Sequence, residues 1–194
     1  MRTNINRWGS LLAAACVLLG ASSCRNNDDD PVAPEPVNEE ELITALELHF
    51  TSSGGTEHKL MNFMDADGAG GTSPVVLADT LSADSVYTVQ AVLYREGADL
   101  PEDITGEILA EATDHQFFFA VNVANASITY ADVDANGHPV GLLTNWAMGA
   151  ASTGIVTVTL RHQPDKSAAG VSGGDITNAG GETDIEVALP LVIE

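Results

Sequence analysis

Between residues 41 and 194, apolar and polar residues alternate along most of the chain. A period of two places successive side chains on opposite faces of a strand, so each such segment predicts a strand with one buried face. The pattern is clearest over 184–193, where five apolar residues fall on one side: Ile185, Val187, Leu189, Leu191 and Ile193. The other predicted strands are 42–50, 58–64, 85–95, 116–123, 126–131, 139–148 and 153–162. Short strands joined by glycine-rich turns favour one all-β domain over 41–194, an antiparallel β-sandwich.

One stretch between the strands has a helical period instead. Ile104, Ile108 and Ala112 are spaced by four residues and form a stripe on one face of a helix. Pro101 suits the first position of a helix, and the two acids that follow it complement the helix dipole. We therefore expect one short helix over 101–113 that caps the sandwich.

The segment 81–91 carries a more specific signal. Its sequence resembles the L…Y-x-V-x-A strand of fibronectin type III domains, in which the tyrosine hydroxyl bonds back to the backbone at a corner. We expect Tyr87 to have this structural role. The segment is short, so immunoglobulin/fibronectin III-like, transthyretin-like and calycin-like sandwiches all stay open.

The N-terminus has a different pattern. Arg2 and Arg7 precede an uncharged, largely apolar stretch over 8–22, which is typical of a secretion signal. Because a membrane-spanning helix needs about 20 apolar residues, we expect this shorter stretch to be cleaved.

The apolar stretch ends in Leu19-Gly-Ala-Ser-Ser-Cys24, which resembles the lipobox of bacterial lipoproteins, with Ala21 where leucine is more common. Cleavage before Cys24 frees its amino group and thiol for acylation, and the acyl chains then hold the protein to a membrane. We predict a lipoprotein signal peptide over 1–23 and lipidation of Cys24. An ordinary secretory cut near Ser23 and a cut before Cys16 are the alternatives.

Residues 24–40 predict a disordered, solvated tether, because they contain three prolines, three consecutive aspartates and almost nothing to bury. The run Asp28-Asp29-Asp30 also resembles the acidic export signal of Bacteroidota lipoproteins that are displayed on the outer face of the outer membrane. A solvated linker explains the same residues. The expected location is the outer membrane, with a lipid anchor and surface exposure.

Charge and cysteine content narrow the chemistry. The formal net charge is −21, and loss of Arg2 and Arg7 with the signal peptide makes it −23, so nucleic acid is not an expected partner. With Cys16 removed and Cys24 acylated, no thiol is left for a disulfide, a metal or a nucleophile. The sequence also has no P-loop, HExxH or CxxC motif, so we expect no enzyme.

Two groups of residues are candidates for metal binding. Asp132, Asp134 and Asn136 fit the opening of a calcium loop, but Leu143 stands where the closing glutamate belongs, so a complete EF-hand is excluded. The alternative is a plain hairpin turn at Asn136-Gly137 between Tyr130 and Val140.

The histidines form the second group. If the first hairpin closes on Ser53-Gly54, His49 faces His58 across it, and two such imidazoles could share Zn²⁺ or Cu²⁺. A register slip of one residue destroys this arrangement. His115 and His162 stand at strand ends, at the rim of the core, where they could ligate a metal with nearby carboxylates or hydrogen-bond to loop backbone.

Three stretches give the mature domain a family resemblance: 114–118 (DHQFF), 161–166 (RHQPDK) and 174–186 (GDITNAGGETDIE). They resemble small flavobacterial-type lipoproteins that carry the label "type 1 periplasmic binding fold superfamily protein". A type 1 periplasmic binding protein is a two-lobed α/β structure of about twice this length with repeated βα units, and the alternation seen here favours the β-sandwich instead. Members of the group accompany TonB-dependent outer-membrane receptors, so the resemblance implies an accessory role in uptake.

These observations give two functional hypotheses. The first is a non-catalytic, surface-anchored binding module that helps a TonB-dependent receptor to capture a metal ion (Zn, Cu or Ca) or a small ligand. The second is a structural or protein-interaction lipoprotein without a small ligand, whose sheet edges or glycine-rich 163–182 loop contact a partner.

Overall fold

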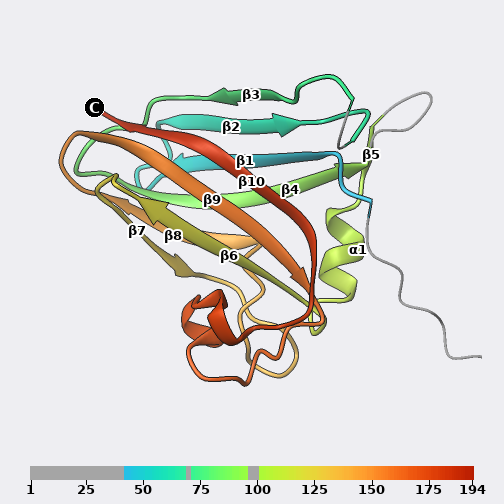
Figure 1. Cartoon of the computed structure of the whole chain (residues 1–194). Helices are drawn as coiled ribbons and strands as arrows, with labels where there is room; N and C mark the ends of the chain where they lie inside the picture. The colour runs from blue at the N-terminus through green and yellow to red at the C-terminus, as the bar shows by residue number, and fades with distance from the viewer. Residues whose placement is uncertain (1–41, 69–70, 96–100) are drawn as a thin grey trace, which may run out of the picture. The chain divides into compact units, whose positions relative to one another are not determined.

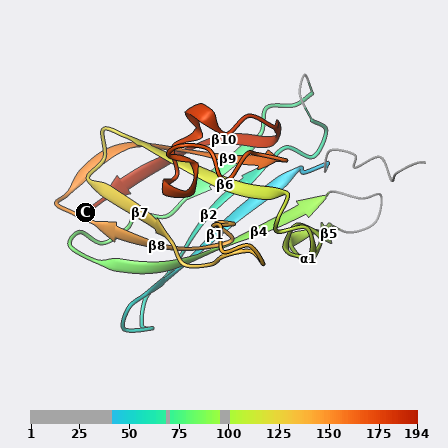
Figure 2. The ribbon, with the colours of Figure 1, turned by 90° about the horizontal axis from the view of Figure 1, so that it is seen from below.

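The computed structural model describes residues 42–68, 71–95 and 101–194. The predicted signal peptide, Cys24 and the tether lie outside the described residues. The described residues form one compact unit. Its strands make two antiparallel sheets that pack face to face, as Figures 1 and 2 show, so the predicted all-β, antiparallel sandwich with a single short α-helix is confirmed.

The larger sheet has seven strands. Six of them follow the order β3-β2-β1-β4-β8-β7, and β5 pairs with the end of β4. The strands are β1 (Ala45–Ser52), β2 (His58–Met64), β3 (Val75–Ala78), β4 (Val86–Arg95), β5 (Glu102–Asp103), β7 (Ala126–Tyr130) and β8 (Leu143–Met148).

The smaller sheet has the order β10-β9-β6, with β6 (His115–Asn122), β9 (Ser152–His162) and β10 (Glu182–Ile193). The helix α1 (Thr105–Ala110) lies at one end of the sheets (Figure 1). The connection from β9 to β10 holds two short 3₁₀ helices, η1 (Val171–Gly173) and η2 (Ile176–Asn178). No helix in the described part of the chain is long and apolar enough to cross a membrane.

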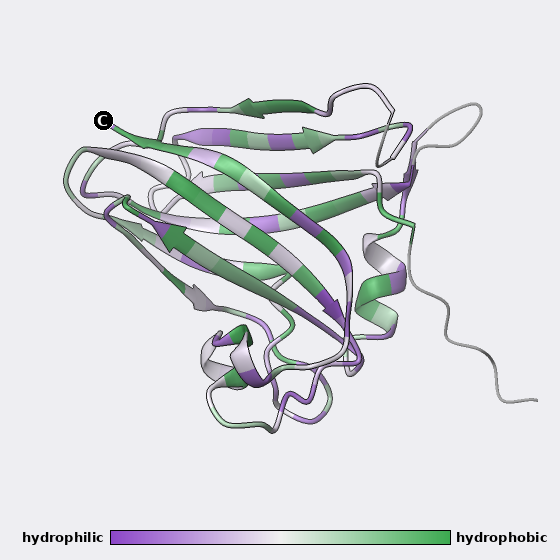
Figure 3. Cartoon of the chain, in the orientation of Figure 1, coloured by the Kyte–Doolittle hydropathy of each residue, from purple (hydrophilic) through white to green (hydrophobic). Residues whose placement is uncertain are grey.

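The core lies between the sheets, and Figure 3 shows the alternation of apolar and polar residues along the strands that line it. The inner faces supply Leu46, Leu48 and Phe50 from β1 and Val156, Val158 and Leu160 from β9, all almost fully buried. Trp146 packs edge-on against Phe50, with the ring centroids 5.1 Å apart. Each buried aliphatic side chain contributes about 1.5–3 kcal/mol to folding, so the alternating pattern itself selects this packing.

Tyr87 forms the corner that its segment predicts. Its hydroxyl accepts the backbone N–H of Ser82 at 3.0 Å and donates to Glu57 Oε2 at 2.8 Å. The ring is fully buried beside Phe50. The structural role expected for Tyr87 is therefore confirmed.

Two elements differ from the sequence prediction. Strand β3 has no alternation, because all four of its residues are exposed at the edge of the larger sheet, and the apolar pattern gave no reason to expect it. The predicted helix over 101–113 is shorter, since Glu102 and Asp103 pair with β4 as β5 and the helix starts only at Thr105. Glu102 also accepts a hydrogen bond from Arg95, which holds this short strand in place.

Candidate metal centre

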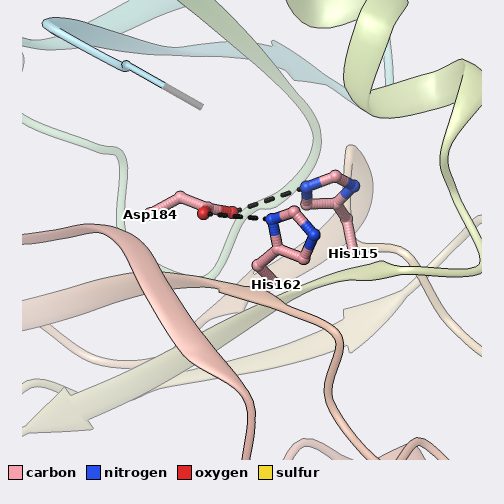
Figure 4. Close-up of side chains that lie close together, drawn as sticks. All are labelled: His115, His162 and Asp184. Carbon is pink, nitrogen blue, oxygen red and sulfur yellow. Dashed lines mark ion pairs between the residues drawn. The ribbon is translucent and has the colours of Figure 1, made fainter. Parts of the chain in front are cut away.

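Three buried side chains meet at one end of the smaller sheet: His115 from β6, His162 from β9 and Asp184 from β10 (Figure 4). The histidines are direct partners across the β6–β9 ladder, and their ring centroids lie 4.7 Å apart. The Asp184 carboxylate faces both rings. Its Oδ2 lies 3.5 Å from His115 Nε2, and its Oδ1 lies 3.5 Å from His162 Nδ1.

A β-bulge brings Asp184 into this group. The β9–β10 register shifts between Thr183 and Ile185, so one extra residue of β10 stands opposite β9 at this point. Strict alternation would turn Asp184 away from the core, because its neighbour Ile185 is buried there. Bulges re-aim a side chain in this way, and they are frequent beside functional sites.

A backbone contact sets the protonation of the His115 ring. Its Nδ1 lies 3.1 Å from the carbonyl oxygen of Glu111, which directly follows α1. A carbonyl can only accept, so Nδ1 carries the hydrogen, and in the neutral ring Nε2 keeps its lone pair. Among the described residues, Nε2 has no hydrogen-bond partner. Metal-binding histidines usually have their second ring nitrogen held in this way.

Burial favours the neutral, ligating form of His115. Desolvation is the largest influence and lowers the pKa of the ring, and the nearby His162 lowers it further. The bond to the Glu111 carbonyl and the Glu111 and Asp114 charges act in the opposite direction but are outweighed. The lowered pKa favours the form of His115 that presents a lone pair at Nε2.

The distances match the spacing of ligands around one ion. Zinc binds imidazole nitrogen and carboxylate oxygen at about 2.0–2.2 Å, so two ligands of a tetrahedral zinc lie about 3.3–3.6 Å apart. Both histidine–carboxylate distances are 3.5 Å, and all three ligand atoms lie within 4.8 Å of one another. These separations are also within the range of ion pairs between the histidines and the carboxylate, and they leave room for a cation bound by all three groups.

The predicted pairing of His49 with His58 does not form. His49 pairs with Leu60, and His58 pairs with Thr51, so the two histidines are not opposite each other. The prediction was wrong because the turn is longer than Ser53-Gly54: strand β1 continues to Ser52 and β2 begins only at His58. The ring of His49 instead bonds to Glu47 at 2.8 Å, and that of His58 contacts the Thr51 hydroxyl at 3.3 Å.

The calcium-loop residues use their oxygens on the protein itself. Asp132 accepts the backbone N–H groups of Gly141 and Leu143 through its two carboxylate oxygens. Asp134 Oδ1 accepts the N–H groups of Asn136 and His138 in a tight turn. These contacts support the hairpin-turn interpretation.

Asp134 takes part in a second buried cluster that the sequence did not suggest. Its Oδ2 lies 3.0 Å from the Lys166 ammonium, which also donates to the carbonyls of Ala112 and Pro139. Burial raises the pKa of Asp134, but the bonds from Lys166, His138 and Asn136 outweigh burial and lower the pKa overall. This cluster is a charge pair that the protein completes by itself.

Sequence reasoning also missed Asp184 as a member of the candidate metal centre, because nothing in the sequence marks the bulge. No protein-family model, no curated protein and no solved structure matches this chain. The functional argument therefore depends on the geometry of the centre.

Proposed function

We propose that this protein is a non-catalytic binding module that holds one divalent transition-metal ion between His115, His162 and Asp184. The observation that carries the proposal is the convergence of two imidazoles and one carboxylate at the spacing of zinc ligands. Imidazole nitrogen suits Zn²⁺ and Cu²⁺, whereas Ca²⁺ prefers a shell of oxygens, so Zn²⁺ is the best fit and Cu²⁺ the next.

The burial of the centre supports retention of an ion over catalysis. The three side chains are between 0 and 5% exposed. A catalytic zinc keeps an open coordination position that a substrate can reach, whereas a structural or storage site is closed. The fourth ligand of an ion in this centre would accordingly be a confined water or a neighbouring protein oxygen.

The sequence supports a location for this module at the outer membrane. A lipid on Cys24 and an acidic tether would hold it at the outer membrane, facing outward. The resemblance to lipoproteins that accompany TonB-dependent receptors favours a role beside such a receptor, in the capture of a metal ion. Recovery of a receptor with the native lipoprotein after cross-linking in intact outer membranes tests this part, and its consistent absence would remove it.

Isothermal titration tests metal binding directly. The mature chain with Cys24→Ser, which cannot be acylated, is titrated with Zn²⁺, Cu²⁺ and Ca²⁺. We expect one Zn²⁺ per chain and loss of binding in His115→Ala, while the exposed control His58→Ala binds as the parent does. Failure of both Zn²⁺ and Cu²⁺ to bind more tightly than about millimolar, against the micromolar or tighter values of real sites, contradicts the proposal.

One observation favours the second candidate function, a protein-interaction role. The edge strand β3 exposes Val75 and Leu77, by 47% and 62%, and has no charged residue within it. Exposed apolar edges are usually protected by charge, and they are sites where another strand can pair. If a partner docks there, Leu77→Lys will abolish its recovery from outer membranes, whereas Leu109→Lys, at an equally exposed position on α1, will not.

A further inference from the structure

The metal centre lies where the segment 163–181 leaves and rejoins the smaller sheet. His162 is the last residue of β9, and Asp184 is the third residue of β10. The two ends of the segment also touch: the N–H of Asp165 donates to Ala179 O at 2.7 Å, and a side chain on Gly181 would collide with the His162 carbonyl. An ion bound by His162 and Asp184 thus ties the base of this segment, which we call the cover loop.

The cover loop packs on the outer face of the smaller sheet through one small apolar cluster and several hydrogen bonds. Val171 and Ala179 bury Phe118 in a small cluster that is separate from the main core. Gln116 donates to the carbonyl of Val171 at 2.8 Å. Segments with few apolar contacts open at low free energy, so the polar contacts of the cover loop and the groups at its base both influence how readily it opens.

The cover loop also forms part of the protein surface. Ser172 contacts the His138 ring at 3.2 Å and lines a groove of about 430 Å³ with Tyr130, Asp132 and Pro139. Lys166 links the loop to the turn that contains Asp134. If the cover loop becomes more or less ordered, the surface that contains this groove therefore changes as well.

We infer that the bound ion is a latch: its occupancy of the centre fixes the base of the cover loop and orders the face that Ser172 and Tyr130 share. The inference rests on the proposed metal binding. An ion bound by His115, His162 and Asp184 removes the conformations in which β6, β9 and β10 separate at this end of the sheet. Both ends of the cover loop are attached to the sheet at this point. By linkage, an ordered loop must in turn favour the bound ion.

Amide hydrogen exchange of the mature Cys24→Ser protein, with and without Zn²⁺, tests the latch. We expect Zn²⁺ to slow exchange over 163–181 at least about fivefold, the lower end of typical coupling, and to leave the β1–β2 hairpin unchanged. If titration shows one bound Zn²⁺ and exchange in the cover loop stays the same, the latch is wrong and the metal-binding function stands. If no Zn²⁺ binds, both fail.

The reciprocal effect gives a second test. Val171→Ala loosens the cover loop without touching a ligand, and we expect it to weaken Zn²⁺ affinity about fivefold or more. Lys166→Met should also weaken Zn²⁺ affinity. It leaves the buried Asp134 carboxylate without its cation, however, so if Lys166→Met does not fold, the Val171→Ala result decides. Leu109→Ala, on the exposed side of α1, is the control and should keep the parent affinity. A folded Val171→Ala protein with unchanged affinity overturns the latch.

Discussion

Two buried polar clusters lie at the cover loop, and they differ in the hydrogen-bond donors, acceptors and lone pairs that their side chains supply. In the first, the Lys166 ammonium meets one carboxylate and two carbonyls, so donor and acceptors are all present in the chain. In the second, two imidazoles and the Asp184 carboxylate converge, and each can supply a lone pair. The first cluster is a structural charge pair, whereas the second contains two ion-pair contacts and also has the composition of a ligand set. Both clusters are buried, so burial alone does not distinguish a structural charge pair from a candidate ligand set. The donor and acceptor atoms of the side chains do.

The largest expected effect comes from breaking the first cluster. Lys166→Met leaves the buried Asp134 carboxylate without its cation, and we expect a loss of about 3–5 kcal/mol in the free energy of unfolding. Urea denaturation measures it. The matched double variant, Asp134→Leu with Lys166→Met, removes both charges and should recover much of the loss. A single variant as stable as the parent would show that the pair carries little energy.

The contribution of the second cluster to stability should depend on whether the ion is bound. At a free Zn²⁺ concentration of 100 times the dissociation constant, we expect the parent to gain about 2.7 kcal/mol in stability. Asp184→Ala should lose this gain, although it keeps both histidines. Thermal unfolding with and without Zn²⁺ measures the difference. Equal Zn²⁺-dependent stabilisation of the parent and of Asp184→Ala would remove Asp184 from the site.

Acid should distinguish the first cluster by a smaller effect. The pKa of Asp134 is lowered in the folded protein, so the pair contributes stability at pH values above the ordinary aspartate range, near about 3.9. This contribution is lost as the pH falls through the folded pKa. The stability difference between the parent and the Asp134→Leu/Lys166→Met double variant should therefore change below about pH 4 and stay constant above pH 5. A constant difference down to pH 3 would contradict the assignment.

The smallest effect is expected at the exposed histidines of the first hairpin. His58→Ala should alter stability by no more than about 0.5 kcal/mol and leave Zn²⁺ affinity unchanged, because surface substitutions without buried partners have little effect. The same titration and urea experiments measure both values. A large loss of affinity in His58→Ala would place a metal site on the larger sheet instead of at the centre described above.

The sequence predicted most of the fold because alternation depends on local chemistry: a buried face must be apolar wherever the strand lies. It placed His115 and His162 at strand ends. It could not predict that they lie opposite each other, because pairing depends on the order of strands in the sheet. The His49–His58 prediction failed on the length of one turn, and Asp184 was missed because a bulge reverses the alternation at that residue. Edge strand β3 was missed since an exposed strand does not need an alternating pattern.

The bulge in β10 makes the candidate metal centre sensitive to the length of this strand. Loss of the single codon for Thr183 would restore a regular ladder with β9 and turn Asp184 toward the outer face, beside Arg161. The two histidines would then stand alone, although no ligand had been substituted. The number of side chains that converge in the candidate centre thus depends on the length of one strand, so we expect a single insertion or deletion there to be enough to remove one of them.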